Sequence, residues 1–99
     1  MATYTIQVTD DAKMDLSFYT AFERKMIVVE IRTQLVYEPT TETRNRKKLN
    51  QHPIAAWELR VGKYRVFYQV DARSELVSVI SIGHKEHNRL YIRNREVEI

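Results

Sequence analysis

A predicted β-hairpin carries charged side chains at alternating positions, where a strand would place them on one face. Glu58 and Arg60 precede the dipeptide Gly62-Lys63, and Arg65 follows it. A two-residue turn at Gly62, of type II′, would set Arg60 opposite Arg65. Facing like charges cost stability, so a purely structural sheet gains nothing from this placement. A guanidinium fork binds two oxygens of one phosphate, and this face therefore predicts an anion site.

The segment 84–91 adds groups that transfer or donate protons. It contains His84 and His87, two of the three histidines of the chain, together with Lys85, Arg89 and Tyr91. Histidine is the side chain that titrates near neutral pH without help, so His84 and His87 are candidate general acids. Lone histidines also occur as ordinary surface or structural residues. No histidine–carboxylate cluster has the spacing of metal ligands, and we expect neither a metal nor a cofactor.

The charge of the chain is unevenly distributed. Residues 1–43 carry four Lys/Arg against seven Asp/Glu, whereas residues 44–99 carry twelve against six. Four of these cations crowd into five positions of a polar connector, 40–53: Arg44, Arg46, Lys47 and Lys48. Such asymmetry favours a nucleic-acid partner, with Arg60 and Arg89 as further contacts. A merely solvated basic surface is the alternative.

The elements that must position these residues belong to one α+β domain spanning 1–99. Alternation in 4–8 predicts a strand, and 11–19 reads as a short helix. Thr20 and Glu23 match a capping box, which predicts a second helix from Thr20 that ends before Pro39. Its apolar positions at helical spacing are Phe22, Met26, Val29 and Leu35, with Val28 and Ile31 beside them. An antiparallel sheet of three to four strands should follow.

Within that sheet, alternate residues from Trp57 to Val70 form the core side, and an apolar third strand covers 76–83. Ser81, Gly83 and Lys85 then share the face of Arg65. The tail from Ile92 is either a strand or a hairpin around Asn94. The chain has no cysteine, no signal peptide and no apolar run long enough to cross a bilayer, and we expect a cytoplasmic protein without a membrane partner.

Two stretches carry a resemblance to a known family. They are Trp57 to Val70, WELRVGKYRVFYQV, and Val79 to Lys85, VISIGHK, with Leu90-Tyr91 downstream. This pattern resembles the RelE/ParE superfamily of small bacterial toxins, RelE-like subgroup, over essentially the whole chain. The resemblance implies a toxin that a cognate antitoxin protein holds inactive. RelE-like members cut mRNA on the ribosome, whereas ParE-like members poison DNA gyrase.

The same resemblance implies site residues. The arginine after the Gly-x-Tyr of the hairpin falls on Arg65, the basic residue after the third strand on Lys85, and a tyrosine near the C-terminus on Tyr91. The lysines of the strand before the hairpin are missing, because Ala56 and Glu58 stand there. We therefore expect Glu58 to serve as the base, or else only to relieve the repulsion between the two arginines.

The expected activity is a metal-independent mRNA endonuclease. RNA cleavage through the 2′-hydroxyl needs a base, a cation for the phosphate and an acid for the leaving oxygen. A gyrase inhibitor of the ParE kind and a non-catalytic RNA-binding module remain as alternatives.

Overall fold

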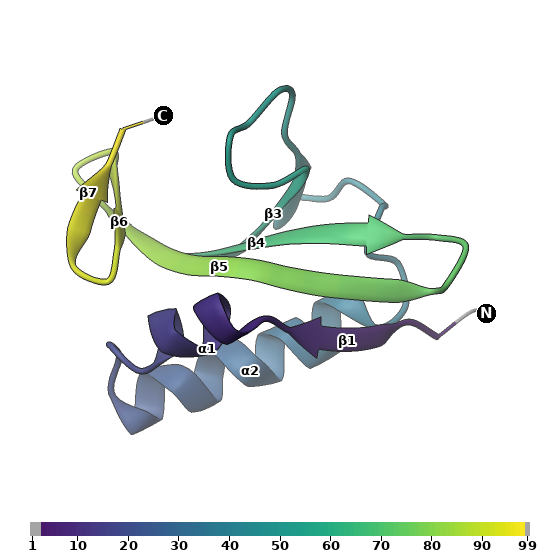
Figure 1. Ribbon diagram of the computed structural model, residues 1–99, viewed down its shortest axis with the longest axis horizontal. Coiled ribbons are helices and arrows are strands. Elements are labelled where there is room, and N and C mark those ends of the chain that lie inside the picture. Colours follow the sequence, from purple (N-terminus) through teal and green to yellow (C-terminus); the bar gives the residue numbers. More distant parts are fainter. Residues whose placement is uncertain (1–2, 99) are drawn as a thin grey trace.

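The computed structural model describes residues 3–98, which form a twisted sheet covered on one side by two helices (Figure 1). The elements in chain order are β1 (Thr5–Val8), α1 (Asp10–Leu16), α2 (Ala21–Leu35), β2 (Arg46–Lys48), β3 (Trp57–Val61), β4 (Tyr64–Asp71), β5 (Leu76–Glu86), β6 (Arg89–Ile92) and β7 (Arg95–Val97). Neither helix within this range is long and apolar enough to span a bilayer.

The predicted α+β architecture is confirmed, but the sheet is larger than the three to four strands expected. Strands β2 to β7 follow one another in an antiparallel path, and β1 joins β5 in parallel. The tail is a hairpin, because Arg93 and Asn94 both adopt positive φ in a two-residue turn between β6 and β7. The connector also contributes a strand, β2, which pairs with β3.

Local caps define the helix starts: α2 begins after Thr20 as predicted, whereas α1 spans Asp10–Leu16 instead of the predicted 11–19. The Thr9 hydroxyl accepts a hydrogen bond from the Ala12 amide, and Thr20 and Glu23 form the reciprocal capping box. Each such cap satisfies amides that the first helical turn leaves without partners. Helix α2 ends at Leu35, before Pro39.

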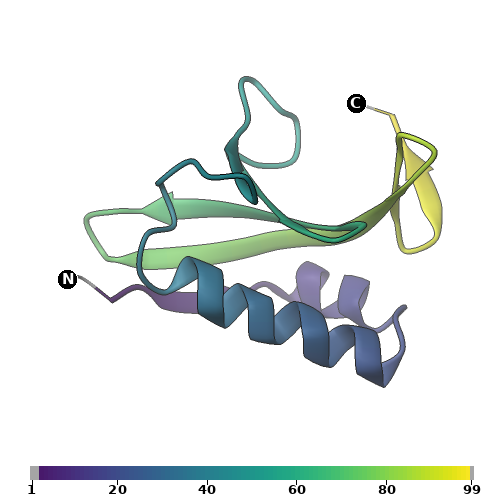
Figure 2. The same cartoon turned by 180° about the vertical axis from the view of Figure 1, so that it is seen from behind.

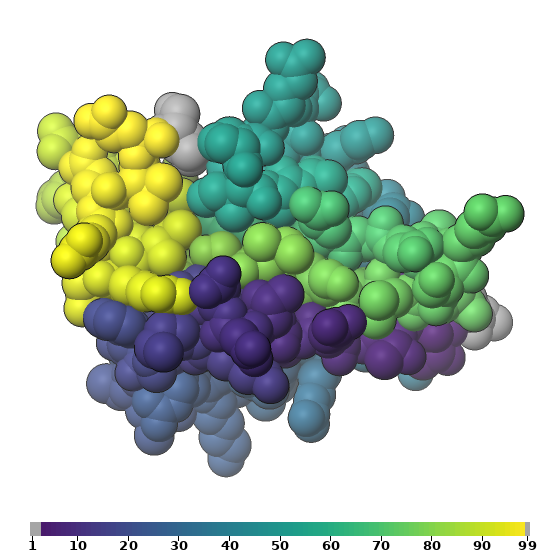
Figure 3. All heavy atoms as spheres, in the orientation of Figure 1, coloured from purple at the N-terminus to yellow at the C-terminus, as the bar shows by residue number. Residues whose placement is uncertain are grey.

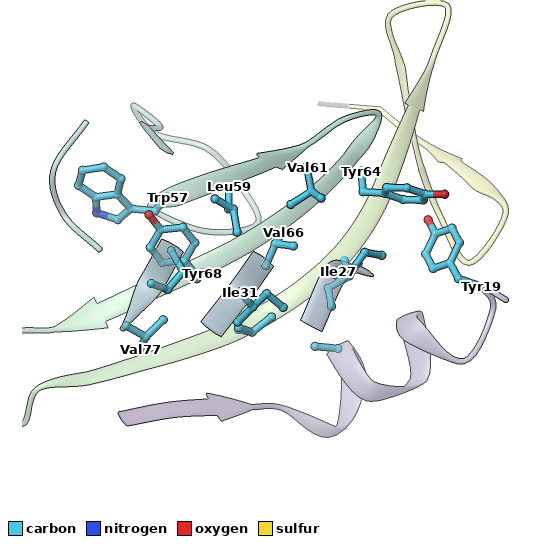
Figure 4. Packing of buried hydrophobic residues seen from close by; sticks show 14 residues of the cluster. Tyr19, Ile27, Ile31, Trp57, Leu59, Val61, Tyr64, Val66, Tyr68 and Val77 are labelled. Carbon is cyan, nitrogen blue, oxygen red and sulfur yellow. The ribbon is translucent and has the colours of Figure 1, made fainter. Parts of the chain in front are cut away.

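The side of α2 that packs on the sheet differs from the prediction. Ile27, Ile31 and Leu35 are buried against the sheet, whereas Phe22 is 78% exposed and Val29 51% (Figure 4). The helix has two apolar stripes, and only one of them reaches the core. Figure 2 shows α2 lying along the sheet with its other side open.

The core on this side, called the helix face, follows the predicted alternation. Trp57, Leu59, Val61, Tyr64, Val66 and Tyr68 point toward α2 (Figure 4). The hairpin register pairs Val61 with Tyr64 and Arg60 with Arg65, and Gly62 has φ +57° as the predicted turn requires.

Strand β5 changes phase halfway along. Its register with β4 shifts between Phe67 and Tyr68, so that Val79 and Ile82, three residues apart, both lie in the helix-face core. Past this irregularity, Gly83 lies under the C-terminal hairpin. A Cβ there would meet the Tyr91 carbonyl oxygen at 2.4 Å, so glycine is what lets β6 cross so closely.

Candidate nucleic-acid interface

The side of the sheet away from the helices carries a charged row that we call the basic face: Lys47, Glu58, Arg60, Arg65 and Lys85. Register places Lys47 beside Glu58, and Arg60 beside Arg65, on three adjacent strands. Arg65 pairs in turn with Gly83, and Lys85 lies two residues further along β5 on the same side. The structure thus brings together five of the residues that the sequence singled out.

Glu58 lies between the two arginines of this face. Its carboxylate, with a side chain only 8% exposed, accepts a hydrogen bond from Arg60 Nε at 3.1 Å. Arg65 Nε lies 3.8 Å from the other carboxylate oxygen, which is an ion pair but longer than a hydrogen bond. The single negative charge therefore offsets the repulsion between two directly opposed cations, and the face keeps a net positive charge.

Arg65 is the least satisfied polar group of the site. Its Nη1 donates to the carbonyl oxygens of Gly62 at 2.8 Å and Tyr64 at 2.9 Å. Its Nε is buried and has no hydrogen-bond acceptor within residues 3–98. Burial lowers the pKa of the Arg65 guanidinium, and the neighbouring Glu58 opposes that shift. A buried donor without an acceptor costs free energy, and the Arg65 side chain would recover that cost by turning toward an anion at this face.

Two projections border the basic face. The segment 49–56 and the β6–β7 hairpin rise from the same side of the sheet, with β4 and β5 between them (Figures 1 and 3). Phe67, only 1% exposed, packs in an apolar cluster with Ala55 from the first projection and Leu90 from the second. These contacts fix both projections relative to the strands that carry Glu58 and Arg65.

His52, whose ring packs on this cluster, was not among the residues predicted from the sequence. Its ring stacks on Phe67 at a centroid distance of 5.4 Å and an interplanar angle of 21°. Register pairs Phe67 with Glu58, so His52 lies over the same side of the sheet as the basic face. The available signal was its place in a connector too long for a simple loop.

The connector cations separate because β2 alternates. Lys47 joins the basic face, whereas Arg46 points to the opposite side, is 9% exposed and donates to the carbonyl oxygens of Gln34 and Thr41. Arg46 thus fixes the connector to the end of α2 rather than facing an external phosphate, contrary to the prediction. Lys48 shares the side of Arg46 and is exposed, as is Arg44 before the strand.

His84 and Tyr91 do not join Arg65. His84 of β5 pairs with Tyr64 of β4 on one side and with Tyr91 of β6 on the other. Each lies one residue along its strand from the row that contains Arg65 and Gly83. Because side chains alternate along a strand, His84 and Tyr91 lie on the helix face. The Tyr91 ring stacks on His84, and His84 Nδ1 lies 2.6 Å from the Tyr19 hydroxyl. Burial lowers the pKa of His84, although Glu86 opposes this. His84 is therefore held in a packed cluster.

The remaining predicted residues lie at the rim. His87 occupies the β5–β6 turn with φ 51°, and Arg89 pairs with Glu96 of β7 at 3.2 Å. Beside the His84 cluster, the Tyr64 hydroxyl donates to Glu23 of α2. This hydrogen bond lowers the pKa of Glu23 to about 2. The pKa of Tyr64 is raised to about 12, first by burial and then by the hydrogen bond to Glu23.

A second buried carboxylate, Asp15 of α1, was also missed. It accepts hydrogen bonds from Ser81 Oγ and the Ile82 amide, each at 2.9 Å, and from Arg93 Nε at 2.6 Å. Asp15 thus ties α1 to β5 and to the turn of the C-terminal hairpin. Nothing in the local sequence distinguishes it from Asp10 or Asp11.

Comparison with known proteins shows the family and the fold of the chain. The family model of the ParE toxin of the type II toxin–antitoxin system parDE matches residues 6–89. A chain of the toxin–antitoxin complex RelBE2 from Mycobacterium tuberculosis is 28% identical, with a TM-score of 0.71 over 86% of this chain and 94% of that one.

Two further solved structures share the fold. The archaeal RelE–RelB complex from Pyrococcus horikoshii contains a chain 21% identical, with a TM-score of 0.68 over 86% of this chain and 98% of that one. The isolated RelE toxin of E. coli is 23% identical, with a TM-score of 0.65 over 85% and 86%. No curated protein matches significantly in sequence. The chain therefore belongs to the ParE toxin family of type II toxin–antitoxin systems, within the RelE/ParE superfamily, and has a RelE-like fold.

Proposed function

We propose that this toxin is a ribosome-dependent, metal-independent mRNA endonuclease of the cytoplasm. The observation that carries the proposal is the state of Arg65 on the basic face. Its buried Nε has no acceptor among the described residues, and Glu58 stands 3.8 Å away. Once the Arg65 side chain turns toward the solvent, a phosphate would accept from the guanidinium that the protein leaves incompletely paired, because guanidinium and phosphate match geometrically.

The other groups of the basic face suit the remaining steps. Glu58 takes the proton of the 2′-hydroxyl, whose oxygen attacks the adjacent phosphorus while the bond to the 5′-oxygen breaks. Arg65 stabilises the charge that develops on the phosphate oxygens. Lys85 adds positive charge on the same face and donates a proton to the departing 5′-oxygen. We leave His84 out of this step because its Nδ1 is hydrogen bonded to Tyr19 on the opposite side of the sheet.

The test is to map mRNA 5′ ends on translating ribosomes after controlled expression. We expect new ends with the wild-type chain, and a loss of cleavage by about 100-fold or more with Arg65→Ala. Arg65→Lys keeps the charge but not the fork and should fall between them. Arg73→Ala is the matched control, because Arg73 is an exposed arginine in the β4–β5 turn. Intact messages during growth arrest would sink the proposal.

Gyrase inhibition is the second candidate. It is favoured by the family model, which describes a ParE toxin, and by Glu58 and Ala56 at the positions where RelE-type members carry lysine. A supercoiling assay with purified gyrase separates the two activities. Inhibition by stoichiometric toxin, with Arg65→Ala as potent as wild type, would establish this candidate. Salt-sensitive RNA binding without cleavage or gyrase inhibition would instead indicate a non-catalytic module.

We infer a cognate antitoxin as partner, because two of the solved structures with a similar fold are toxin–antitoxin complexes. The second apolar stripe of α2 offers it a surface, since Phe22 and Val29 are exposed and border a hollow of about 370 Å³. A helical or extended segment would cover these side chains, and acidic residues in it would suit the basic face. Phe22→Ser should weaken the complex about 10-fold or more and leave mRNA cleavage unchanged.

A further inference from the structure

We propose that His52, seated on Phe67, is a stacking platform for one nucleobase of single-stranded RNA beside the phosphate held by Arg65. The inference rests on the proposed RNA-directed function and specifies a base-binding subsite for it. It assigns a ligand contact to the connector segment 49–56, which the cleavage chemistry does not use.

The His52 ring is held in place from two directions. One of its faces lies on Phe67, which is itself 1% exposed and locked in the apolar cluster beneath. In the ring plane, Nδ1 accepts a hydrogen bond from the Ile54 amide at 3.1 Å. The ring is therefore fixed before any ligand arrives, which reduces the entropy lost on binding.

His52 remains accessible despite these contacts. The residue is half-buried and borders a hollow of about 310 Å³ that is also lined by Gln51, Pro53 and Gln69. Hollows of about 300–1,000 Å³ are the size that small ligands occupy. Aromatic side chains, histidine included, are the surfaces on which proteins stack unpaired RNA bases. Gln69 adds an amide that can both donate to and accept from the edge of a base.

The distance to the phosphate site suits one nucleotide. Phe67 and Arg65 are two residues apart on β4 and face the same side, which separates their backbones by about 7 Å. A single-stranded RNA with one phosphate at Arg65 would therefore have a neighbouring base near His52.

The hydrogen bond at Nδ1 argues for stacking rather than proton transfer. An Nδ1 that accepts a hydrogen bond from a backbone amide is occupied within the protein and does not meet a ligand. A ring that serves only as a platform can be replaced by phenylalanine, whereas a proton donor cannot. His52→Phe and His52→Ala thus distinguish the two roles.

The experiment measures the affinity of the full chain for a short single-stranded RNA made uncleavable by 2′-deoxy substitution, using fluorescence anisotropy at several salt concentrations. We expect His52→Ala to weaken binding about 10-fold and His52→Phe to stay within about 2-fold of wild type. An abasic nucleotide at the stacked position should weaken wild-type binding equally and add nothing to His52→Ala. The salt dependence should stay unchanged, in contrast to Arg65→Ala. Tyr37→Ala is the control, because Tyr37 is an aromatic side chain that is 55% exposed and follows α2, outside the basic face.

Wild-type affinity in His52→Ala would overturn the inference, as would a His52→Phe variant that folds normally and binds as weakly as His52→Ala. Both results leave RNA binding by Arg65, and hence the proposed function, intact. A wild-type chain that does not bind this RNA would also overturn the inference, whereas the proposed cleavage is tested separately on translating ribosomes, so the two failures are distinct.

Discussion

Asp15 of α1 and Glu58 of β3 are two buried carboxylates, and their surroundings differ. Asp15 accepts three short hydrogen bonds, from Ser81, Ile82 and Arg93, and each of its oxygens has a donor. Glu58 has one hydrogen bond, from Arg60, and a second arginine 3.8 Å away whose Nε donates to no acceptor among residues 3–98. The first arrangement is closed by the protein itself, whereas the second leaves a cation available.

The comparison separates a buried carboxylate with a structural role from one that lies in a candidate binding site. A buried charge with a complete set of partners holds elements together, and its removal exposes the cost of the donors left behind. The one hydrogen bond of Glu58 joins it to Arg60 of its own strand, so this carboxylate ties no distant elements together. The incomplete group is therefore the better candidate for meeting an external anion.

The largest effect should follow from Asp15→Asn. The amide places a donor against donors, and the Ile82 amide or the Arg93 guanidinium loses its acceptor. We expect the free energy of unfolding to fall by about 2–4 kcal/mol, measured by urea denaturation. Asp11→Asn is the matched control, because Asp11 contacts the same Arg93 from a side chain that is 88% exposed, and should change little. Equal losses in both variants would remove the distinction drawn above.

Glu58→Gln should cost less stability but more activity. We expect a loss of about 1 kcal/mol, since Arg60 is half-exposed and can turn to solvent. RNA should bind more tightly, because one negative charge is gone from the basic face, while cleavage falls about 100-fold if Glu58 is the base. Normal cleavage by this variant would reduce Glu58 to a partner of the two arginines. A loss of stability as large as that of Asp15→Asn would contradict the comparison itself.

The smallest effect concerns a third buried group, His84, and depends on pH. Burial lowers its pKa in the folded chain, so the unfolded chain binds the proton first as the pH falls. Stability should therefore be unaffected above about pH 6.5 and decrease below it, until the folded chain is protonated too. The slope from this one group is at most about 1.4 kcal/mol per pH unit.

Thermal or urea unfolding between pH 8 and pH 5 measures this slope. His84→Gln should flatten the profile in that range, whereas His87→Gln, in the exposed β5–β6 turn, should leave it as in wild type. A profile that His84→Gln does not change would show that the Tyr19–His84 contact opens easily in the folded chain.

Much of the fold could be predicted because its signals are local. The Thr20–Glu23 capping box, the turn at Gly62 and the alternation from Trp57 to Val70 depend on residues close in sequence. These same local signals placed Glu58, Arg60 and Arg65 on one face, as the structure confirms. The side of β5 that carries Lys85 was also predicted correctly.

The errors arose where one pattern allowed two solutions. Helix α2 has two apolar stripes, and periodicity alone does not say that Ile27 and Ile31 pack while Phe22 is exposed. The connector cations were predicted to form one cluster, because β2 is too short to recognise in the sequence. In the structure the alternation of β2 places Arg46 and Lys47 on opposite sides of the sheet.

Other features were hidden because they depend on contacts distant in sequence. Asp15 meets partners 66 to 78 residues away, and no local motif announces them. The His52–Phe67 stack likewise joins the connector to β4. The residues that the strands contribute to the candidate site could thus be predicted, whereas the contacts of the two projections that border it could not.

The parallel pairing of β1 with β5 has a consequence for how the chain folds during its synthesis. Thr5 pairs with Leu76, so the first strand waits for a partner made 71 residues later. At about 5–20 residues per second, the interval during synthesis is roughly 4–14 s. During that time the edge of β1 has no partner strand. The row of Arg60, Arg65 and Gly83 also needs β5. The fold and the basic face are therefore completed by the same late event.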